Sequence, residues 1–136
     1  MGKGNLTKKE VQSIIDEVYP KIEKYYGISK FFECSPYVEV ERNIFEKYSG
    51  IEGMEGDDDG NNSCHAEFCH MNNEITIYYP QMKDRKMVIE SLVHEYQHHL
   101  QSPIWFKRYY TMGYDYITHP YEIQATNEEK NWVLFN

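Results

Sequence analysis

The sequence predicts an α+β fold in which a small, mostly antiparallel sheet packs on one histidine-bearing helix, with further helices near both ends. Residues 86–100 contain no Gly or Pro and place apolar residues at three- and four-residue spacing, which is typical of a helix. Residues 37–41, 63–69 and 74–79 are rich in β-forming residues. Helix-start signals at Thr7 and Thr118 complete the prediction.

The first helix is expected to begin at about Thr7. Thr7 and Glu10 have the spacing of a capping box, in which each side chain satisfies a backbone N–H of the other residue. Apolar residues then recur at helical spacing: Val11, Ile14, Ile15 and Val18. Pro20 is expected to end or kink this helix, with a short second piece reaching Gly27. No residue here points to a chemical role.

Three strands and one acidic loop are expected next. Residues 63–69 and 74–79 read as strands joined by a turn at 71–73, and 37–41 as a further strand. A strand at 74–79 could lie at the sheet edge and pair with an extended peptide. Residues 50–62 are Gly-rich and acidic, which predicts a flexible loop. This loop lacks EF-hand spacing, because Asn62 stands where the Gly belongs and Phe68 where the Glu belongs.

The motif His94-Glu95-x-x-His98 lies inside the predicted central helix. Residues four apart share one face of a helix, so His94 and His98 can bind one Zn²⁺ at about 2.0–2.1 Å. Glu95 follows the first of these ligands and therefore lies beside the metal. There it can take a proton from a metal-bound water and pass it to a leaving amine. This is the H-E-x-x-H pattern of zinc metallopeptidases.

A third zinc ligand is expected from the C-terminal helix, which should run from about Thr118 to about Leu134. Its first turn offers His119 and Glu122. The small Ala125, on the same side as Glu122, would allow close approach to the motif helix. Glu129, two turns beyond Glu122, is expected to face solvent or to support a ligand.

An aromatic stretch, residues 104–118, separates these two helices. We expect it to form an irregular hydrophobic lid over the second half of the core. The candidates for stabilising a tetrahedral oxyanion come from this stretch and from the residues that follow it: Tyr116, His119 and Tyr121.

His94-Glu95-x-x-His98 followed by Glu122-x-x-Ala125 resembles the gluzincin type of zinc metallopeptidase. More narrowly, it is similar to the minimal gluzincins and to the ImmA/IrrE-like peptidases of bacteria, phages and mobile elements. The resemblance implies a zincin-like fold, His94, His98 and Glu122 as zinc ligands, and Glu95 as general base. It covers roughly residues 75–130.

The chain departs from this pattern at two positions. Larger gluzincins have an Asn before the ligand Glu and an Asp after the small residue, where this chain has Tyr121 and Thr126. The acidic residue that would orient a ligand imidazole is therefore not assigned. A third ligand at His119 would instead resemble the SprT-like group, but no His-Gly segment follows it and the chain is acidic. We therefore favour Glu122.

Length and composition set the remaining expectations. With 136 residues the chain fits one zincin-like domain, residues 1–136, and a net charge of −8 argues against nucleic-acid binding. No apolar run could span a membrane, and the N-terminus lacks a signal-peptide core. Three cysteines, an odd number, suit a reducing compartment. We expect free thiols, because neither Cys-His pair near residues 64–70 supplies the four ligands of a second zinc.

The sequence thus predicts a cytoplasmic, monomeric zinc peptidase that acts on a protein or peptide. One alternative is a zinc-containing module that binds a partner strand without cleaving it. Another is a purely structural zinc with four protein ligands, for which His99 and His119 are the additional histidines.

Overall fold

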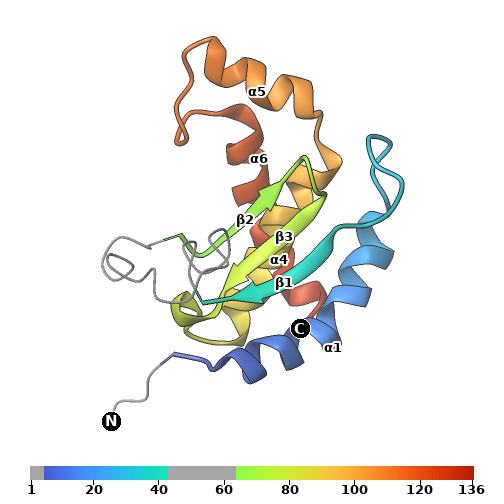
Figure 1. Cartoon of the computed structure of the whole chain (residues 1–136), viewed down its shortest axis with the longest axis vertical. Helices are drawn as coiled ribbons and strands as arrows, with labels where there is room; N and C mark the ends of the chain where they lie inside the picture. Colours follow the sequence, from blue (N-terminus) through green and yellow to red (C-terminus); the bar gives the residue numbers. More distant parts are fainter. Residues whose placement is uncertain (1–4, 43–63) are drawn as a thin grey trace.

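The computed structural model describes residues 5–42 and 64–136. Within these ranges the chain forms an α+β fold with a three-stranded sheet (Figure 1). The elements are, in order, α1 (Lys8–Tyr26), β1 (Tyr37–Glu41), β2 (Ala66–Cys69), β3 (Glu74–Tyr78), the 3-10 turn η1 (Tyr79–Gln81), α4 (Arg85–Leu100), α5 (Pro103–Thr111), α6 (Pro120–Glu128) and the 3-10 helix η2 (Glu129–Leu134). The predicted acidic loop, residues 50–62, lies outside the described residues.

Helix α1 begins with the predicted capping box. The Thr7 hydroxyl accepts a hydrogen bond from the Glu10 N–H at 3.1 Å, and the Glu10 carboxylate accepts one from the Thr7 N–H at 2.8 Å. The helix runs through Pro20 and ends at Gly27, whose φ of 77° favours glycine. Pro20 does not end the helix, because it is exposed and water can satisfy the carbonyl that loses its partner.

The sheet is mixed, with the strand order β1-β3-β2. β1 pairs with β3 in parallel, whereas β2 pairs with β3 in antiparallel orientation. Only one of these two pairings is therefore of the predicted antiparallel kind. The prediction that the strand at 74–79 could form an edge is wrong, since β3 lies between β1 and β2. The edge strand that faces α4 and the site described below is β2.

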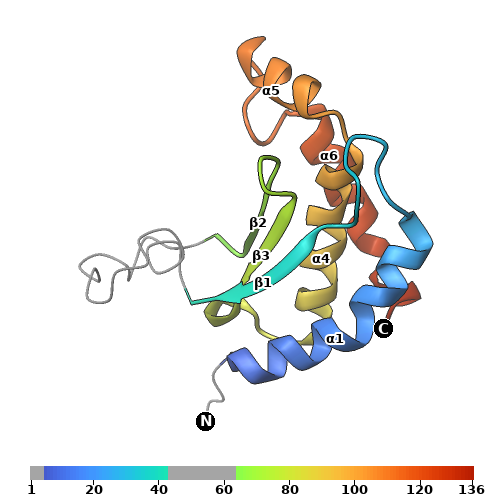
Figure 2. The same cartoon turned by 45° about the vertical axis from the view of Figure 1, so that its right-hand side comes forward.

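Helix α4 is the centre of the fold. It contacts β2 and β3 on one side and α1, α6 and η2 on the others, as Figure 2 shows. The predicted apolar stripe is buried, with Ile89, Leu92, Val93 and Tyr96 each at 0% exposure. They join Ile75 and Ile77 of β3 and the apolar face of α1 in one core. Because other elements pack around α4 on several sides, the histidines of α4 are buried as well.

The segment after α4 differs from its prediction. Residues Pro103–Thr111 form helix α5, in which the Ser102 hydroxyl caps the N-terminus by accepting from the Trp105 N–H at 3.3 Å. The segment does not pack as a lid over the core, because Ile104 is 67% exposed and Ile117 79% exposed. Phe106, by contrast, turns inward, and its ring centroid lies 4.7 Å from that of His119.

Helix α6 begins at Pro120, two residues after the predicted start at about Thr118, and tightens into η2 at Glu129. Ala125 of α6 is completely buried, and α6 contacts α4. The chain then ends on the core, with Phe135 only 2% exposed and its ring 5.5 Å from that of Tyr25. The C-terminal segment is therefore anchored at both ends. No helix in the described ranges is long and apolar enough to cross a bilayer.

We predict that Ala125→Leu destabilises the protein by about 1–3 kcal/mol, because the larger side chain overpacks the contact between α4 and α6. Thermal unfolding of the variant measures the loss. Ile123→Ala is the matched control on the same helix, since Ile123 is 47% exposed. Equal melting temperatures for the two variants would contradict a close α4–α6 contact at Ala125.

Candidate metal centre

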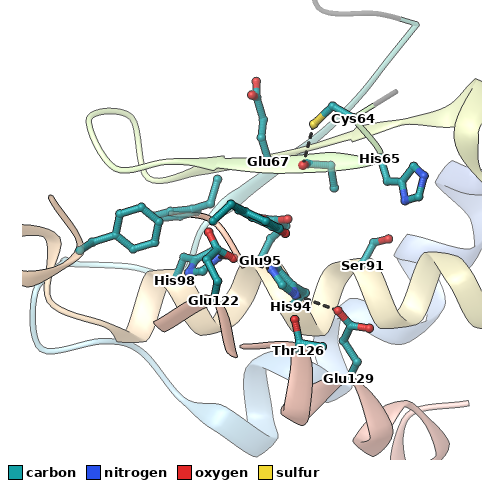
Figure 3. A pocket seen from close by; sticks show the side chains of 14 residues that line it. Cys64, His65, Glu67, Ser91, His94, Glu95, His98, Glu122, Thr126 and Glu129 are labelled. Carbon is teal, nitrogen blue, oxygen red and sulfur yellow. Dashed lines mark hydrogen bonds and ion pairs between the residues drawn. The ribbon is translucent and has the colours of Figure 1, made fainter. Parts of the chain in front are cut away.

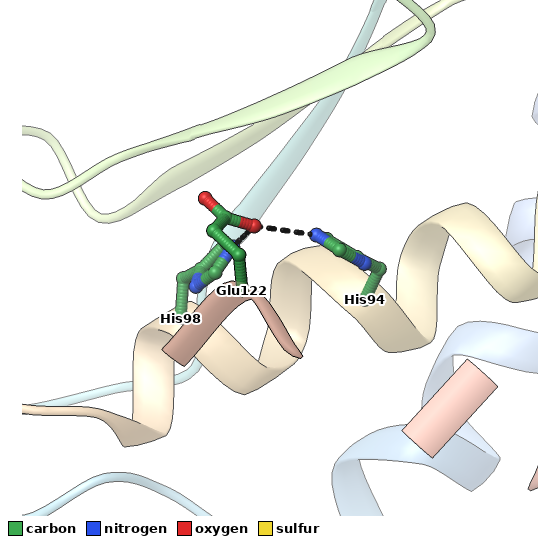
Figure 4. Close-up of side chains that lie close together, drawn as sticks. All are labelled: His94, His98 and Glu122. Carbon is green, nitrogen blue, oxygen red and sulfur yellow. Dashed lines mark hydrogen bonds and ion pairs between the residues drawn. The ribbon is translucent and has the colours of Figure 1, made fainter. Parts of the chain in front are cut away.

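Two histidines of α4 and one glutamate of α6 meet at a single point. The Oε1 atom of Glu122 lies 3.0 Å from His94 Nε2 and 3.1 Å from His98 Nε2 (Figure 4). His94 and His98 share a face of α4 because they are four residues apart. Glu122 reaches them because it lies one turn into α6, just before the buried contact at Ala125. The structure thus brings together the three residues that the sequence resemblance implies as ligands.

The geometry of this group suits a metal ion. The three residues are 6%, 4% and 7% exposed, in the order His94, His98 and Glu122. Each offers one ligand atom, and these atoms all lie within 4.8 Å of one another. A tetrahedral ion with bonds of about 2.0–2.1 Å separates neighbouring ligand atoms by about 3.3 Å. The observed nitrogen–oxygen separations of 3.0 and 3.1 Å are within a few tenths of that value.

Both imidazoles are oriented by partners on their other nitrogen. His94 Nδ1 lies 2.8 Å from a Glu129 carboxylate oxygen, and His98 Nδ1 lies 2.7 Å from the Gln101 amide oxygen. Both partners are acceptors, so each Nδ1 carries the hydrogen that it donates. Without a metal, Nε2 carries a further hydrogen that the Glu122 carboxylate accepts, and a metal ion would replace that hydrogen at the lone pair of Nε2. This is the arrangement by which proteins orient histidine ligands to a metal.

Glu129 therefore supplies the orienting carboxylate that the sequence pattern left unassigned. The position where larger gluzincins have Asp is Thr126 here, whose side chain lines the same cavity. Glu129 lies seven residues after Glu122, so two helical turns bring it back to the same side. That spacing is the available signal in the sequence, and it predicts either a solvent-facing or a supporting position for Glu129.

A chain of glutamine side chains fixes the second imidazole. Gln101 Nε2 donates to the Tyr121 carbonyl at 3.0 Å and also to the Gln124 amide oxygen. Gln124 Nε2 donates in turn to the Gln97 amide oxygen at 3.2 Å. Because these bonds alternate between α4 and α6, they tie the orientation of His98 to the helix that carries Glu122. Sequence reasoning missed this chain, since only the packing of the two helices brings the glutamines together.

The other histidines near the motif have different roles. His119 caps α6, where its Nδ1 accepts from the Tyr121 N–H at 3.1 Å and its Nε2 donates to the Phe106 carbonyl at 2.8 Å. His99 is equally committed: its Nε2 accepts from the Ser29 N–H at 3.0 Å and its Nδ1 donates to the Asn73 amide oxygen at 2.9 Å. With both ring nitrogens in use, neither histidine is placed to be a further ligand.

A cavity of about 500 Å³ opens onto the His-His-Glu group (Figure 3). Strand β2 forms one wall, and the face of α4 that carries His94, Glu95 and His98 forms another. Of the three residues predicted as oxyanion stabilisers, Tyr116 lines this cavity. Tyr121 instead packs its ring against Phe106 and Tyr109, with centroids 6.4 and 5.4 Å away.

Burial and charge together set the proton affinities in the cavity. Burial alone lowers the pKa of His94, but hydrogen bonds to Glu122 and Glu129 outweigh it and raise this pKa to about 10. Burial raises the pKa of Glu122, yet its hydrogen bonds to His94 and His98 lower it to about 2. Glu122 is thus an ionised carboxylate at neutral pH. Burial raises the pKa of Glu95, and the neighbouring histidines only partly offset this.

We predict that the wild-type chain binds about one divalent metal ion, and that His94→Ala and Glu122→Ala each abolish binding, because two remaining ligands hold the ion weakly. Elemental analysis after zinc loading and desalting measures this. His65→Ala is the control, since His65 lines the cavity outside the ligand group and its loss should leave the metal content unchanged. Metal retained by Glu122→Ala would remove Glu122 from the ligand set.

We also predict that Gln101→Leu lowers metal affinity about 10- to 100-fold, because His98 Nδ1–H loses its acceptor. Competition with a chelator of known affinity measures the change. Gln101→Glu keeps an acceptor at the same distance from the backbone and should stay closer to wild type. If both variants bind metal as the wild type does, the glutamine chain does not orient His98.

Comparisons with protein-family models, with curated proteins and with solved structures found no match to this chain. What the chain does must therefore follow from the residues of the cavity themselves.

Proposed function

We propose that this chain is a zinc-dependent peptidase of the gluzincin type, with a zincin-like fold similar to the minimal gluzincins and the ImmA/IrrE-like peptidases. The observation that carries the proposal is the buried group of His94, His98 and Glu122, with Glu95 in the same cavity. Its substrate would be a protein or peptide. The free cysteines Cys34, Cys64 and Cys69 suit the reducing cytoplasm, where we propose that the chain acts as a monomer.

The ligand chemistry favours zinc. Two imidazoles and one carboxylate form the ligand set of several catalytic zinc sites, in which a fourth position stays open to water or substrate. A zinc ion held here would supply a water whose pKa falls towards about 7 and would polarise the scissile carbonyl. His99 and His119 use both ring nitrogens for hydrogen bonds to other partners, which weighs against a closed site with four protein ligands. The hydrogen bonds of His119 also weigh against the SprT-like alternative, in which His119 would be the third ligand.

Glu95 is the residue suited to proton transfer. It directly follows the ligand His94, it is 8% exposed, and it lines the cavity beside the ligand group. Burial raises its pKa, so its carboxylate takes up a proton more readily than an exposed glutamate does. In the proposed reaction Glu95 accepts a proton from the attacking water and then delivers it to the nitrogen of the leaving amine.

Tyr116 is the best placed of the three candidates for an oxyanion donor. It lines the cavity, and burial, followed by the charges of Glu122 and Glu95, raises the pKa of its hydroxyl to about 12. The hydroxyl therefore stays protonated at neutral pH and can donate a hydrogen bond to a developing negative charge.

Strand β2 supports a peptide as the substrate. The Tyr78 N–H donates to the His65 carbonyl at 3.0 Å, so His65 directs its backbone towards β3. In an antiparallel ladder alternate residues bond to opposite sides, so Ala66 and Phe68 direct their backbone groups to the outer edge. Both residues line the cavity. An extended peptide can add to this edge and place its backbone beside the metal centre.

We predict that Glu95→Gln keeps the metal and lowers peptidase activity by about 10²–10⁴-fold, because the amide cannot accept the proton. Cleavage of a proteome-derived peptide mixture by the zinc-loaded protein, followed by mass spectrometry, measures the activity. Glu128→Gln is the matched control on α6, where Glu128 accepts a hydrogen bond from Tyr26 at 2.9 Å away from the cavity. Cleavage that survives Glu95→Gln would disprove the proposed mechanism. Peptide binding without cleavage by the wild type would instead indicate a binding module.

A further inference from the structure

The two ends of the metal cavity differ in chemistry. At the His98 end, Phe68 of β2 and Phe106 of α5 are half-buried and line the cavity. The ring of Phe106 lies 5.0 Å from that of His98, and the ring of His70 lies 5.0 Å from both phenylalanines. Phe68 and Phe106 therefore form an aromatic wall beside His98, and the His70 ring packs against both of them. We call Phe68 and Phe106 the aromatic wall.

The opposite end of the cavity is polar. Ser91, Thr126 and Glu129 lie on the His94 side in Figure 3. There the cavity meets a second one of about 380 Å³, with which it shares His65, Ser91 and Glu129. The remaining lining of the second cavity is mostly charged: Lys83, Asp84, Lys86 and Glu90. The two cavities thus make one groove that is aromatic at one end and charged at the other.

This groove is long enough for several residues of an extended chain. It follows α4 from His98 back to Lys86, which is twelve residues, or about 18 Å at about 1.5 Å per residue. An extended strand rises about 3.3 Å per residue, so about five residues fit along it. The metal centre lies within this length, close to the aromatic end.

The direction of β2 decides which part of a bound peptide meets the aromatic wall. β2 runs from the charged end, at His65, to the aromatic end, at Phe68. Antiparallel pairing is the more stable kind, so a peptide on the outer edge of β2 should run in the opposite direction. Its N-terminal part then lies at the aromatic wall and its C-terminal part in the charged groove.

We infer that the aromatic wall selects a large apolar side chain on the substrate residue that precedes the scissile bond, while the charged groove accepts polar or charged residues after that bond. This inference rests on the proposed peptidase function and adds the class of substrate. The preferred residue is aromatic or a large aliphatic such as Leu, because its side chain displaces water from Phe68 and Phe106.

Two series of hydroxamates test the inference by binding, without any cleavage. In acetyl-Xaa-hydroxamates the chelating group follows residue Xaa, so that Xaa stands for the residue before the scissile bond. In hydroxamates of succinyl-Xaa-amides, Xaa stands for a residue after it. Calorimetry with the zinc-loaded wild type gives the dissociation constants for Xaa equal to Phe, Leu, Ala, Asp and Lys.

In the first series Phe and Leu should bind about tenfold or more tightly than Ala or Asp, the discrimination that an apolar pocket commonly gives. Phe106→Ala should reduce this preference, whereas Trp105→Ala should keep it, because Trp105 is a neighbouring aromatic residue of α5 that does not line the cavity. Phe106→Leu replaces Phe106→Ala if the latter no longer retains zinc.

Equal binding across the first series would overturn the inference, as would an apolar preference found in the second series alone or no binding in either. The inferred specificity and the proposed peptidase function can fail independently of each other. Selective binding by a wild-type protein that cleaves no peptide would refute the peptidase and keep the specificity. Cleavage that Glu95→Gln abolishes, but whose rate does not depend on the residue before the scissile bond, would support the peptidase and refute the specificity.

Discussion

The packing of α6 on α4 is the contact on which the site depends. His94 and His98 are positioned by one helix, but Glu122 reaches both imidazoles only because α6 packs against α4. The same contact aligns the glutamines that orient His98 and brings Glu129 to His94. A small shift of α6 would therefore change the ligands and their supports together.

Burying this much charge is costly, and the fold offsets the cost by pairing. An isolated buried carboxylate is strongly disfavoured, but Glu122 shares hydrogen bonds with two imidazoles and Glu129 with one. Glu95 is the exception: no residue in the described ranges donates a hydrogen bond that offsets its burial, and its pKa is raised accordingly. A raised carboxylate pKa beside a group of potential metal ligands is consistent with the proton-transfer role proposed for Glu95.

The three histidines of α4 and the one that caps α6 divide into two classes that residue type alone does not distinguish. His94 and His98 each use Nδ1 for an orienting partner and leave Nε2 towards the shared point. His99 and His119 use both nitrogens to hold chain segments together, Ser29 with Asn73 in one case and Phe106 with Tyr121 in the other. The two classes therefore differ in whether one ring nitrogen is left facing the Glu122 carboxylate or both are hydrogen-bonded to other segments of the chain.

The local features follow from the amino-acid sequence: the capping box at Thr7, the helical spacing of His94 and His98, and the start of α6 before Glu122. The packing of whole elements brought Glu122, and not His119, to the two imidazoles, placed β3 at the centre of the sheet, and left residues 103–111 as an exposed helix. Spacing along one helix fixes positions only over a turn or two. Contacts between residues 20 to 35 positions apart, such as Gln101 with Tyr121 and His94 with Glu129, arise from how whole elements pack.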